Sequence, residues 1–503
     1  MAFLKSGSDF PPEEWSYWFD KYKEYAAWYS GDPNELLAYY TTQALNMENG
    51  PFWARTEAEE RTGVVHLPAA GDIASTSGDL LFAEAPRLRY DQASESGKRI
   101  TEFLKENGLN NLLLEGAELS AALGGCFLKL DIEPQLARIP LVSIVSPLQA
   151  FPTFWRGRLC EVLFFRTVKT QESGSVVWRL FENRSRENGG LKIEYKLYKG
   201  QHDKLGREYD FNAIEETSKL NLKPVFYSGF SGLACVYVPN KRPNILDPNS
   251  YLGINDYSSS ITLMDSLDFA WTSWMRDIEL GMAQILVDEA LLDRAVSTGT
   301  DTAYEKARFS KFRKAFIKLN MEPWRMSGEA AKPIEPIQFN LRVEEHSKTC
   351  ERLFAEIVGR CGYSERTFGL TETIGQAASG SALRIRERKS LLTRQKKSRY
   401  WQPAIWELLW QMQQLDMATN LNSFYTPQEV DIELEDSIVT DSKEVSETIR
   451  NIDQARAAST YTKVKILHPE WEEPEILNEV DQILKESGVV ENPFDTERED
   501  DIV

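Results

Sequence analysis

The first half of the chain changes from a helical to a strand-like pattern of apolar residues. Near the start, apolar residues recur at spacings of three and four, which predicts a helix with one aromatic face. They are Trp15, Phe19, Tyr22, Ala26 and Tyr29. A short amphipathic helix is expected within 66–90, and one long helix or a helix pair within 99–124. From there to about 200 the period falls to two in GCFLKLDI, LCEVLFFRTVKT, VVWRLFENRS and LKIEYKLYKG, which predicts an antiparallel β-meander with one buried face.

The second half is dominated by two stretches that predict very long helices. In 251–294, large apolar residues recur at helical spacing. They are Ile261, Met264, Leu267, Trp271, Trp274, Ile278 and Met282. A helix of about 35 residues would be about 50 Å long, whereas helices in globular proteins usually have about 10–14 residues. A second long helix is expected from Ala382 to about Asp416, with a kink at Pro403.

Between and after these helices the pattern is mixed. The stretch 295–341 is rich in turns and contains the strand-like KAFIKLN and PIQFNLRV, and a helix is expected at 343–360. The segment 361–381 is rich in Gly, Ser and Thr and lacks apolar periodicity, so it is expected to be a loop. A strand at 429–439 and two or three helices within 441–487 complete the prediction.

The chain is acidic, with a formal net charge of -19 and a pI near 4.9. A protein that binds DNA over its whole surface usually has the opposite charge, because lysine and arginine neutralise the phosphates. The charge therefore argues against tight DNA binding over the whole surface, but not against a protein through which DNA passes. The chain also lacks the regular alternation of strands and helices that indicates a nucleotide-binding parallel sheet.

The sequence offers no clear catalytic or metal-binding pattern. The four histidines are far apart, HExxH is absent, and neither a GxxxxGK[ST] phosphate loop nor a GxSxG motif occurs. The five cysteines form no CxxC pair, which favours reduced thiols, and the chain has neither a signal peptide nor an apolar run near the ~18 residues that cross a bilayer. We therefore expect a soluble protein made in the cytoplasm, with no enzyme activity, no cofactor and no metal.

The densest basic stretch lies at the start of the second long helix. Eight basic residues between 384 and 399 are opposed only by Glu387. They are Arg384, Arg386, Arg388, Lys389, Arg394, Lys396, Lys397 and Arg399. One interpretation is a solvated helix face, or a face that pairs with acidic residues of a neighbouring subunit. The other interpretation is contact with DNA phosphates.

Tryptophans on the long helices are expected to pack between helices rather than to stack on bases, because their spacings are helical. They are Trp271 and Trp274 on the first helix and Trp401, Trp406 and Trp410 on the second.

The order of these parts resembles the portal proteins of tailed bacteriophages, and specifically the SPP1-like group. The likeness covers most of 15–487 and is carried by several stretches rather than by one motif. These stretches are YYTTQALNMENGPFW, VVHLPAAGDIASTSGDLLFAEAPRL, NDYSSSITLMDSLDFAWTSWMRDIEL, GQAASGSALRIRERKSLLTRQKKSRYW and VDIELEDSIVTDSKEVSETI.

The resemblance implies an α+β portal fold with an α/β wing, a stem of long helices, a small mixed clip, a tunnel loop and a helical crown. The implied parts are a wing at 1–250 with a returning strand at 417–440, a first stem helix at 251–290, a clip at 291–341, a second stem helix at 342–363, a tunnel loop at 364–381, a long kinked wing or crown helix at 382–416, a crown at 441–490 and an acidic tail at 491–503.

The resemblance also implies a function. Portals of this family form a dodecameric ring at one capsid vertex, through which double-stranded DNA is packaged and ejected. The implied partners are other copies of the chain, DNA in the channel, terminase, a head-to-tail adaptor, and the major capsid and scaffolding proteins, with no membrane. Such a protein is assembled in the host cytoplasm and ends in the virion. The tunnel-loop residues expected to face the channel are Glu365, Arg366, Thr371, Glu372, Thr373, Gln376, Ser379 and Ser381.

Two alternatives remain open at this point. A nuclease fused to a helical arm would need a carboxylate cluster that only the fold could bring together. A capsid or scaffold protein without a DNA channel would not need two long helices on either side of a polar loop. The junction of loop and helix at Gly380 separates these readings. A mobile loop at 364–381 that points to a ring axis favours the portal, whereas a segment buried against a sheet contradicts it.

Overall fold

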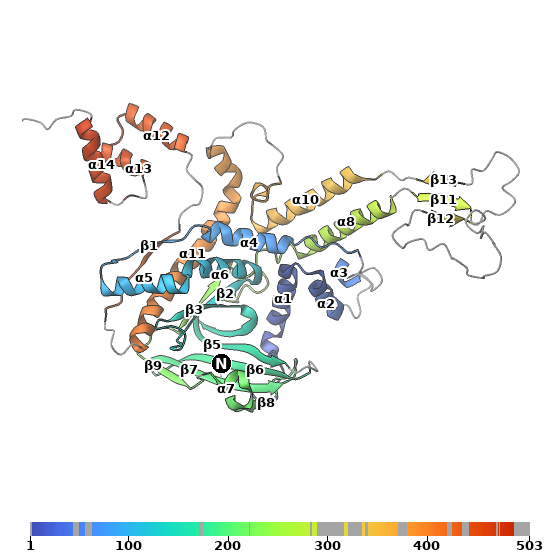
Figure 1. Cartoon of the computed structure of the whole chain (residues 1–503), viewed down its shortest axis with the longest axis horizontal. Coiled ribbons are helices and arrows are strands. Elements are labelled where there is room, and N and C mark those ends of the chain that lie inside the picture. Colours follow the sequence, from blue (N-terminus) through green and yellow to red (C-terminus); the bar gives the residue numbers. More distant parts are fainter. Residues whose placement is uncertain are drawn as a thin grey trace, which may run out of the picture. The chain divides into compact units, whose positions relative to one another are not determined.

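The computed structural model of the chain has an α+β fold (Figure 1). It describes residues 3–43, 50–55, 63–170, 175–220, 222–281, 284–288, 316–319, 334–337, 341–370, 380–419, 425–434, 442–468, 471 and 473–486. The chain divides into two compact units. Unit 1 consists of Met1–Leu370 and Ser390–Glu435, and unit 2 of Thr371–Lys389 and Asp436–Val503.

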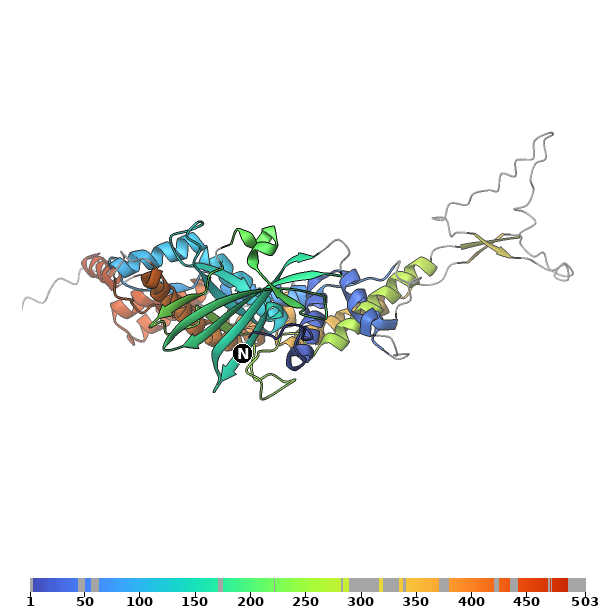
Figure 2. The same ribbon diagram turned by 90° about the horizontal axis from the view of Figure 1, so that it is seen from below.

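An antiparallel sheet of six strands forms one layer of unit 1 (Figures 1 and 2). Its order is β4-β5-β6-β7-β8, and β9 also pairs with β7. The strands are β4 (Ala150–Trp155), β5 (Arg158–Thr170), β6 (Val177–Glu187), β7 (Gly190–Gly200), β8 (Arg207–Tyr209) and β9 (Val225–Ser228). Between β6 and β7 the chain turns at Asn188 and Gly189, whose φ angles of 48° and 75° suit a two-residue turn between twisted strands. The predicted meander is confirmed for β5, β6 and β7.

The meander prediction is wrong for the stretch GCFLKLDI. This stretch forms β2 (Gly125–Asp131), the middle strand of a separate three-stranded sheet with β3 (Leu141–Val145) and β10 (Cys235–Pro239). Most residues of β2 are buried, so it is a core strand and not a half-exposed one. Because β10 lies about a hundred residues later in the chain, the local alternation of apolar residues could not reveal this pairing.

Helices cover this smaller sheet and form the main core of unit 1. Gly108, with a φ of 58°, ends α5 (Glu95–Asn107) and precedes α6 (Leu109–Leu123), so 99–124 is a helix pair. The core joins α6, β2 and β10 to α11 (Gly380–Thr419) and includes Leu113, Phe127, Val238, Trp401 and Leu408.

The N-terminal helices form a second, aromatic core. They are α1 (Glu13–Ser30), α2 (Pro33–Gln43), α3 (Phe52–Arg55) and α4 (Ala69–Phe82). The aromatic face predicted for α1 is confirmed by Phe19, which stacks on Phe151 of β4 with ring centroids 5.0 Å apart. Tyr22 and Trp28 of α1 are buried against α4. The stacking of Phe19 on Phe151 connects α1 to the six-stranded sheet.

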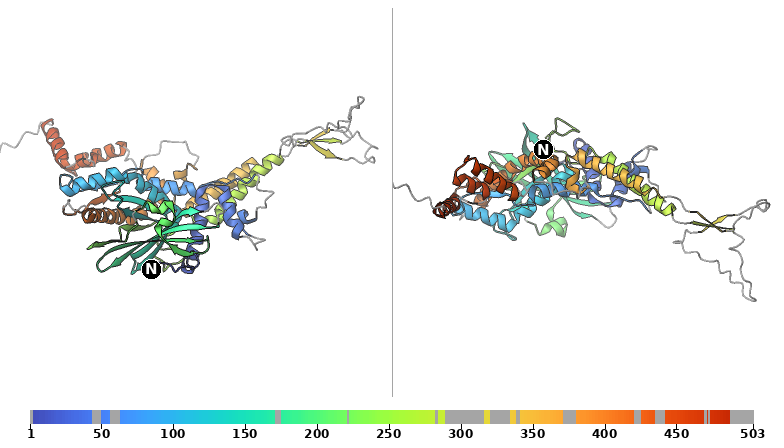
Figure 3. Two further views of the ribbon diagram at one scale, coloured as in Figure 1. Left: turned by 60° about the horizontal axis from the view of Figure 1, so that its bottom comes forward. Right: turned by 90° about the horizontal axis from the view of Figure 1, so that it is seen from above.

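Three helices in the second half correspond to the long helical stretches. They are α8 (Ile261–Leu280), α10 (Val343–Cys361) and α11, and α8 and α10 lie side by side (Figures 1 and 3). The helix expected over about 35 residues of 251–294 is shorter than predicted, since α8 has 20 residues. Leu341 packs so closely on Gly281 that a Cβ there would collide with it.

After α8 the chain enters a small mixed sheet. Its order is β12-β11-β13, with β11 and β12 parallel and β11 and β13 antiparallel. The strands are β11 (Gln284–Asp288), β12 (Phe316–Leu319) and β13 (Ile334–Ile337). The predicted strand KAFIKLN is confirmed, since β12 lies within it. The prediction for PIQFNLRV is met only at Pro336 and Ile337 of β13, because Val343 already begins α10, and β11 replaces the end of the expected helix.

The other elements are short. In unit 1 they are β1 (Arg87–Arg89), which pairs with β14 (Asp431–Glu433), α7 (Glu215–Ser218), and the 3-10 turns Pro147–Gln149, Phe211–Ala213 and Glu365–Phe368. Unit 2 contains α12 (Ser442–Gln454), α13 (Thr460–Leu467) and α14 (Glu473–Glu486), in line with the helices predicted for 441–487. Among the described residues no helix is long and apolar enough to cross a membrane.

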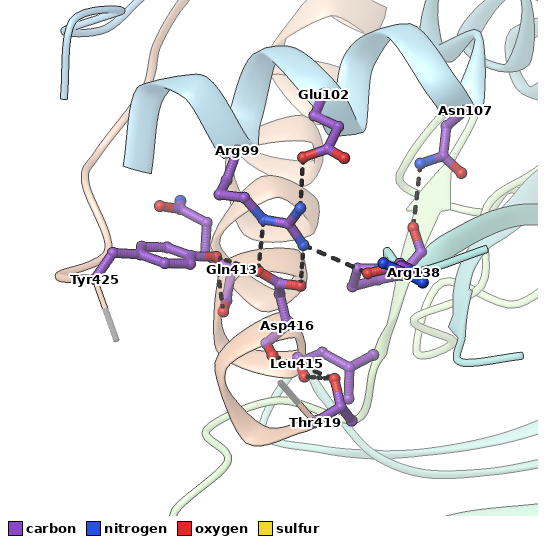
Figure 4. Close-up of polar contacts among 10 residues, drawn as sticks. Arg99, Glu102, Asn107, Arg138, Gln413, Leu415, Asp416, Thr419 and Tyr425 are labelled. Carbon is purple, nitrogen blue, oxygen red and sulfur yellow. Dashed lines mark hydrogen bonds and ion pairs between the residues drawn. The ribbon is translucent and has the colours of Figure 1, made fainter. Parts of the chain in front are cut away.

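The C-terminal end of α11 is attached to α5 by an ion pair (Figure 4). Arg99 donates to both carboxylate oxygens of Asp416, at 3.1 and 2.5 Å, and also binds Glu102. The side chain of Asp416 has no exposed surface, and Tyr425 donates a further hydrogen bond to it at 3.0 Å. A carboxylate that is removed from water needs such donors, so this contact fixes where α11 ends against α5.

We predict that Arg99→Ala lowers the free energy of unfolding by about 2 kcal/mol and the thermal midpoint by about 4 °C, because it leaves Asp416 buried with fewer donors. Thermal unfolding followed by circular dichroism measures this. Lys98→Ala is the matched control, since Lys98 is on the same helix and its pair with Glu95 is solvent-exposed. Equal shifts for the two variants would contradict the assignment.

Candidate functional site

The two helices α8 and α10 are joined by a stacked and hydrogen-bonded contact. Trp271 stacks on Trp274, and Trp274 stacks on His346 of α10, with ring centroids 5.0 and 6.0 Å apart. Asp277 of α8 lies 2.9 Å from Nε2 of His346 and accepts a hydrogen bond of 2.6 Å from Arg342. These two hydrogen bonds lower the pKa of Asp277 below its usual range. The tryptophans therefore pack between helices, as predicted.

The first half of α8 is anchored by a buried carboxylate. Asp268 is fully buried and accepts hydrogen bonds from Nε1 of Trp53 at 3.0 Å and from the backbone amide of Leu67 at 2.9 Å. Its Oδ2 also lies 2.7 Å from Nδ1 of His66. One turn earlier, Asp265 accepts from the amide of Phe52. The segments that contain 50–55 and 63–68 are thus fixed onto α8 by carboxylates that the sequence analysis did not identify.

A second buried carboxylate joins the link before α8 to three other segments. Asp256 lies in the link before α8, and Nζ of Lys397 in α11 is 2.6 Å from its Oδ2. Tyr363, just after α10, donates to the same oxygen at 2.7 Å, and Ser77 of α4 contacts the Lys397 ammonium at 2.5 Å. Asn240 donates to Oδ1 of Asp256 at 2.9 Å. Burial lowers the pKa of Lys397, and Asp256 opposes that shift.

The predicted tunnel loop has an ordered beginning. Glu365 and Arg366 lie in the 3-10 turn Glu365–Phe368, so the loop prediction is wrong for these residues. This turn is held on α11, because Thr367 and Ser390 form a hydrogen bond of 2.8 Å. Helix α11 begins at Gly380 and includes Ser381, whose side chain lies outside the described residues. Thr371, Glu372, Thr373, Gln376 and Ser379 also lie outside the described residues.

The eight basic residues do not form one face. Arg388, Lys389, Lys396 and Arg399 are exposed, whereas the side chains of Arg384 and Arg386 lie outside the described residues. Arg394 is buried and donates to the carbonyl of Leu80 at 2.5 Å, and Lys397 is buried beside Asp256. The prediction that all eight serve a neighbouring subunit or DNA is therefore wrong for Arg394 and Lys397.

Arg394 and Lys397 are buried because the core-facing side of α11 continues towards the N-terminus of the helix. Ser390, Arg394, Lys397 and Trp401 follow one another at spacings of four, three and four, so they share one face of α11, and all are buried. Trp401 packs on Phe82, but Trp406 and Trp410 stack on each other and Trp406 is exposed. Extending the apolar stripe of Trp401, Ile405 and Leu408 towards the N-terminus would have predicted that Arg394 and Lys397 are buried.

The comparisons with known proteins identify the family of the chain. Residues 12–490 match the family model described as "Phage portal protein, SPP1 Gp6-like". The chain belongs to this portal family. The resemblance seen in the sequence is confirmed, and the portal has a structural role as a portal or connector of a phage particle.

Two solved structures are also similar to the portal chain. A chain of "Neck of empty GTA particle computed with C6 symmetry" is 12% identical, with 85% of this chain and 97% of that chain covered and a TM-score of 0.44. A chain of "Neck of native GTA particle computed with C12 symmetry" is 13% identical, with 82% and 92% covered and a TM-score of 0.37. No curated protein matches the sequence. Within the described ranges, no group of three or more His, Cys, Asp and Glu residues could hold a metal ion.

We predict that Asp268→Ala loosens the attachment of 63–68 to α8, because it removes the acceptor of the Leu67 amide and the Trp53 indole. We expect the free energy of unfolding to fall by about 3 kcal/mol. Hydrogen exchange of the Leu67 amide would then be faster, and the thermal midpoint would be lower. Ser266→Ala is the control, since Ser266 is exposed on the same helix and its hydroxyl donates to the carbonyl of Thr262 in that helix. Unchanged exchange at Leu67 in Asp268→Ala would contradict the anchoring role.

Proposed function

We propose that the chain forms a ring of about a dozen subunits at one capsid vertex, with a central channel through which double-stranded DNA is packaged and ejected. The observation that carries this proposal is the family match over 12–490, together with a pair of long helices followed by a polar segment and a third long helix. In this proposal α8 and α10 form the stem, 364–381 contains the tunnel loop, and unit 2 supplies the crown.

Exposed apolar side chains on the stem support a ring. Phe269 and Leu280 of α8 are 54% and 58% exposed, and Leu341 and Val343 at the start of α10 are each 46% exposed. A subunit in a ring offers two different surfaces, each covered by a neighbour. We propose that a second copy of the chain covers these side chains, which would remove them from water.

The charge of the chain suits a channel that does not retain DNA. The net charge is -19, and the exposed charges of α10 are mixed, with Glu344, Glu345, Glu351 and Glu356 among Lys348, Arg352 and Arg360. A wall whose charges nearly cancel would attract phosphates only weakly, so DNA would slide rather than bind. Of the eight basic residues near the loop, Arg394 and Lys397 are used inside the subunit and thus do not add to the positive surface.

Each proposed part of the subunit would contact a different partner. The clip at 291–341 would meet the head-to-tail adaptor and the terminase, the wing at 1–250 would meet the capsid and scaffolding proteins, and the crown at 441–490 would face the capsid interior.

The native mass of the purified protein, with electron micrographs of the same fraction, tests the ring. A particle of about a dozen 57.5 kDa subunits with a central hole is expected. A compact particle without a hole would contradict the proposal.

We predict that deletion of 366–378 leaves the ring intact but reduces packaged DNA by at least about tenfold, because the deleted segment would contact DNA in the channel while the stem holds the subunits together. Native mass measures the ring, and DNase-resistant DNA per particle measures packaging. Normal packaging by the deletion variant would refute the assignment of 364–381 as the tunnel loop.

We predict that Arg384→Glu combined with Arg386→Glu lowers the yield of rings several-fold and changes the affinity of the remaining rings for free DNA by less than about twofold. The reason is that this end of α11 would face acidic residues of a neighbouring subunit. Size-exclusion chromatography and a filter-binding assay measure the two effects. Rings that form normally but lose DNA contact would show that these arginines touch phosphates instead.

A further inference from the structure

The segment after α10 lies along one face of α11. Thr393 donates to the carbonyl of Gly362 at 2.5 Å, and the amide of Ser364 donates to Oγ of Ser390 at 2.8 Å. The hydroxyls of Thr367 and Ser390 are also 2.8 Å apart. Because Ser390 and Thr393 are three residues apart on a helix, they present their hydroxyls to the same side. The start of the proposed tunnel loop is therefore joined directly to α11, the helix that follows the loop.

The ion pair of Lys397 and Asp256 extends this contact by one more turn. Lys397 is seven residues after Ser390 and so lies on the same face of α11. Its ammonium is 3.1 Å from the hydroxyl of Tyr363, which in turn donates to Asp256. Lys397 and Asp256 are 3% and 1% exposed. Separating them would leave two charges in a site without water, which makes this contact costly to open.

A glycine allows the close approach of the two segments. Gly362 has a φ of 96°, and a Cβ at this position would lie 2.9 Å from Oγ1 of Thr393. Any other residue would be strained there and would push Thr393 away. The backbone of 362–364 can thus lie close enough to α11 for its amide and carbonyl to bind hydroxyl side chains.

We propose that these contacts form a clamp, made of Gly362, Tyr363, Ser364 and Thr367 with Ser390, Thr393, Lys397 and Asp256, that stays closed while DNA passes. This inference rests on the proposed portal function. The clamp residues are positioning residues: they fix the start of the tunnel loop on α11 and, through Asp256, on the link that leads into α8. Displacement of the stem and of the start of the loop by DNA is then prevented at the clamp.

A disulfide across the clamp tests this directly. Thr367→Cys combined with Ser390→Cys places two thiols where the hydroxyls are 2.8 Å apart, and oxidation is expected to join them. Peptide mass spectrometry measures the bond, and the wild type is oxidised in parallel to control for its own cysteines. Particles assembled with the oxidised variant are expected to package DNA within about twofold of the same particles after reduction. A tenfold loss on oxidation, or no bond on oxidation, would overturn the clamp.

A matched pair at Thr393 tests positioning without a cross-link. Thr393→Val removes the hydroxyl that binds the Gly362 carbonyl and keeps the shape, whereas Thr393→Ser keeps the hydroxyl. We expect both variants to form rings of unchanged mass, with packaged DNA reduced several-fold only in Thr393→Val. Equal packaging by the two variants would overturn the positioning role. If the reduced cysteine variant and the wild type both failed to package DNA, the proposed portal function itself would be wrong.

Discussion

Buried carboxylates hold the long helices of this portal in place, and the other contacts depend on them. Asp256 binds Lys397 of α11 and Tyr363 after α10, while Asp268 fixes the N-terminal segments onto α8. Asp416 binds Arg99 at the other end of α11. A carboxylate without water is costly unless donors surround it, so each of these side chains specifies which segments must meet.

Local patterns predicted much of the fold, since they depend on neighbouring residues. The aromatic face of α1, the strands β5 to β7 and the span of α11 follow from spacing along the chain. The length of α8 could not be predicted, because the apolar pattern continues past Leu280 while the chain enters β11, which pairs with the later strands β12 and β13. Likewise, β2 belongs to a sheet completed by β10, about a hundred residues away.

The candidate site was harder to predict than the fold. The density of basic residues at 384–399 indicated a basic helix, but it did not show which of these side chains are buried in the subunit and which are exposed. Lys397 and Arg394 are buried because they continue the core stripe of α11, and their partners are more than a hundred residues distant in sequence. The resulting surface is less basic than the sequence suggests, which suits the proposed channel, along which DNA would move without being held. The exposed apolar residues of α8 and the attachment of 362–367 to α11 agree with the proposed ring, in which rigid helices would pack around a narrow set of DNA contacts.

An electron cryo-microscopy map of the assembled particle would show whether the subunits meet in this way. We expect a closed ring in which a neighbouring subunit covers Phe269 and Leu280, the segment 371–379 faces the central axis, and Lys397 remains paired with Asp256. A ring in which these stem residues face solvent and 371–379 points away from the axis would contradict this expectation.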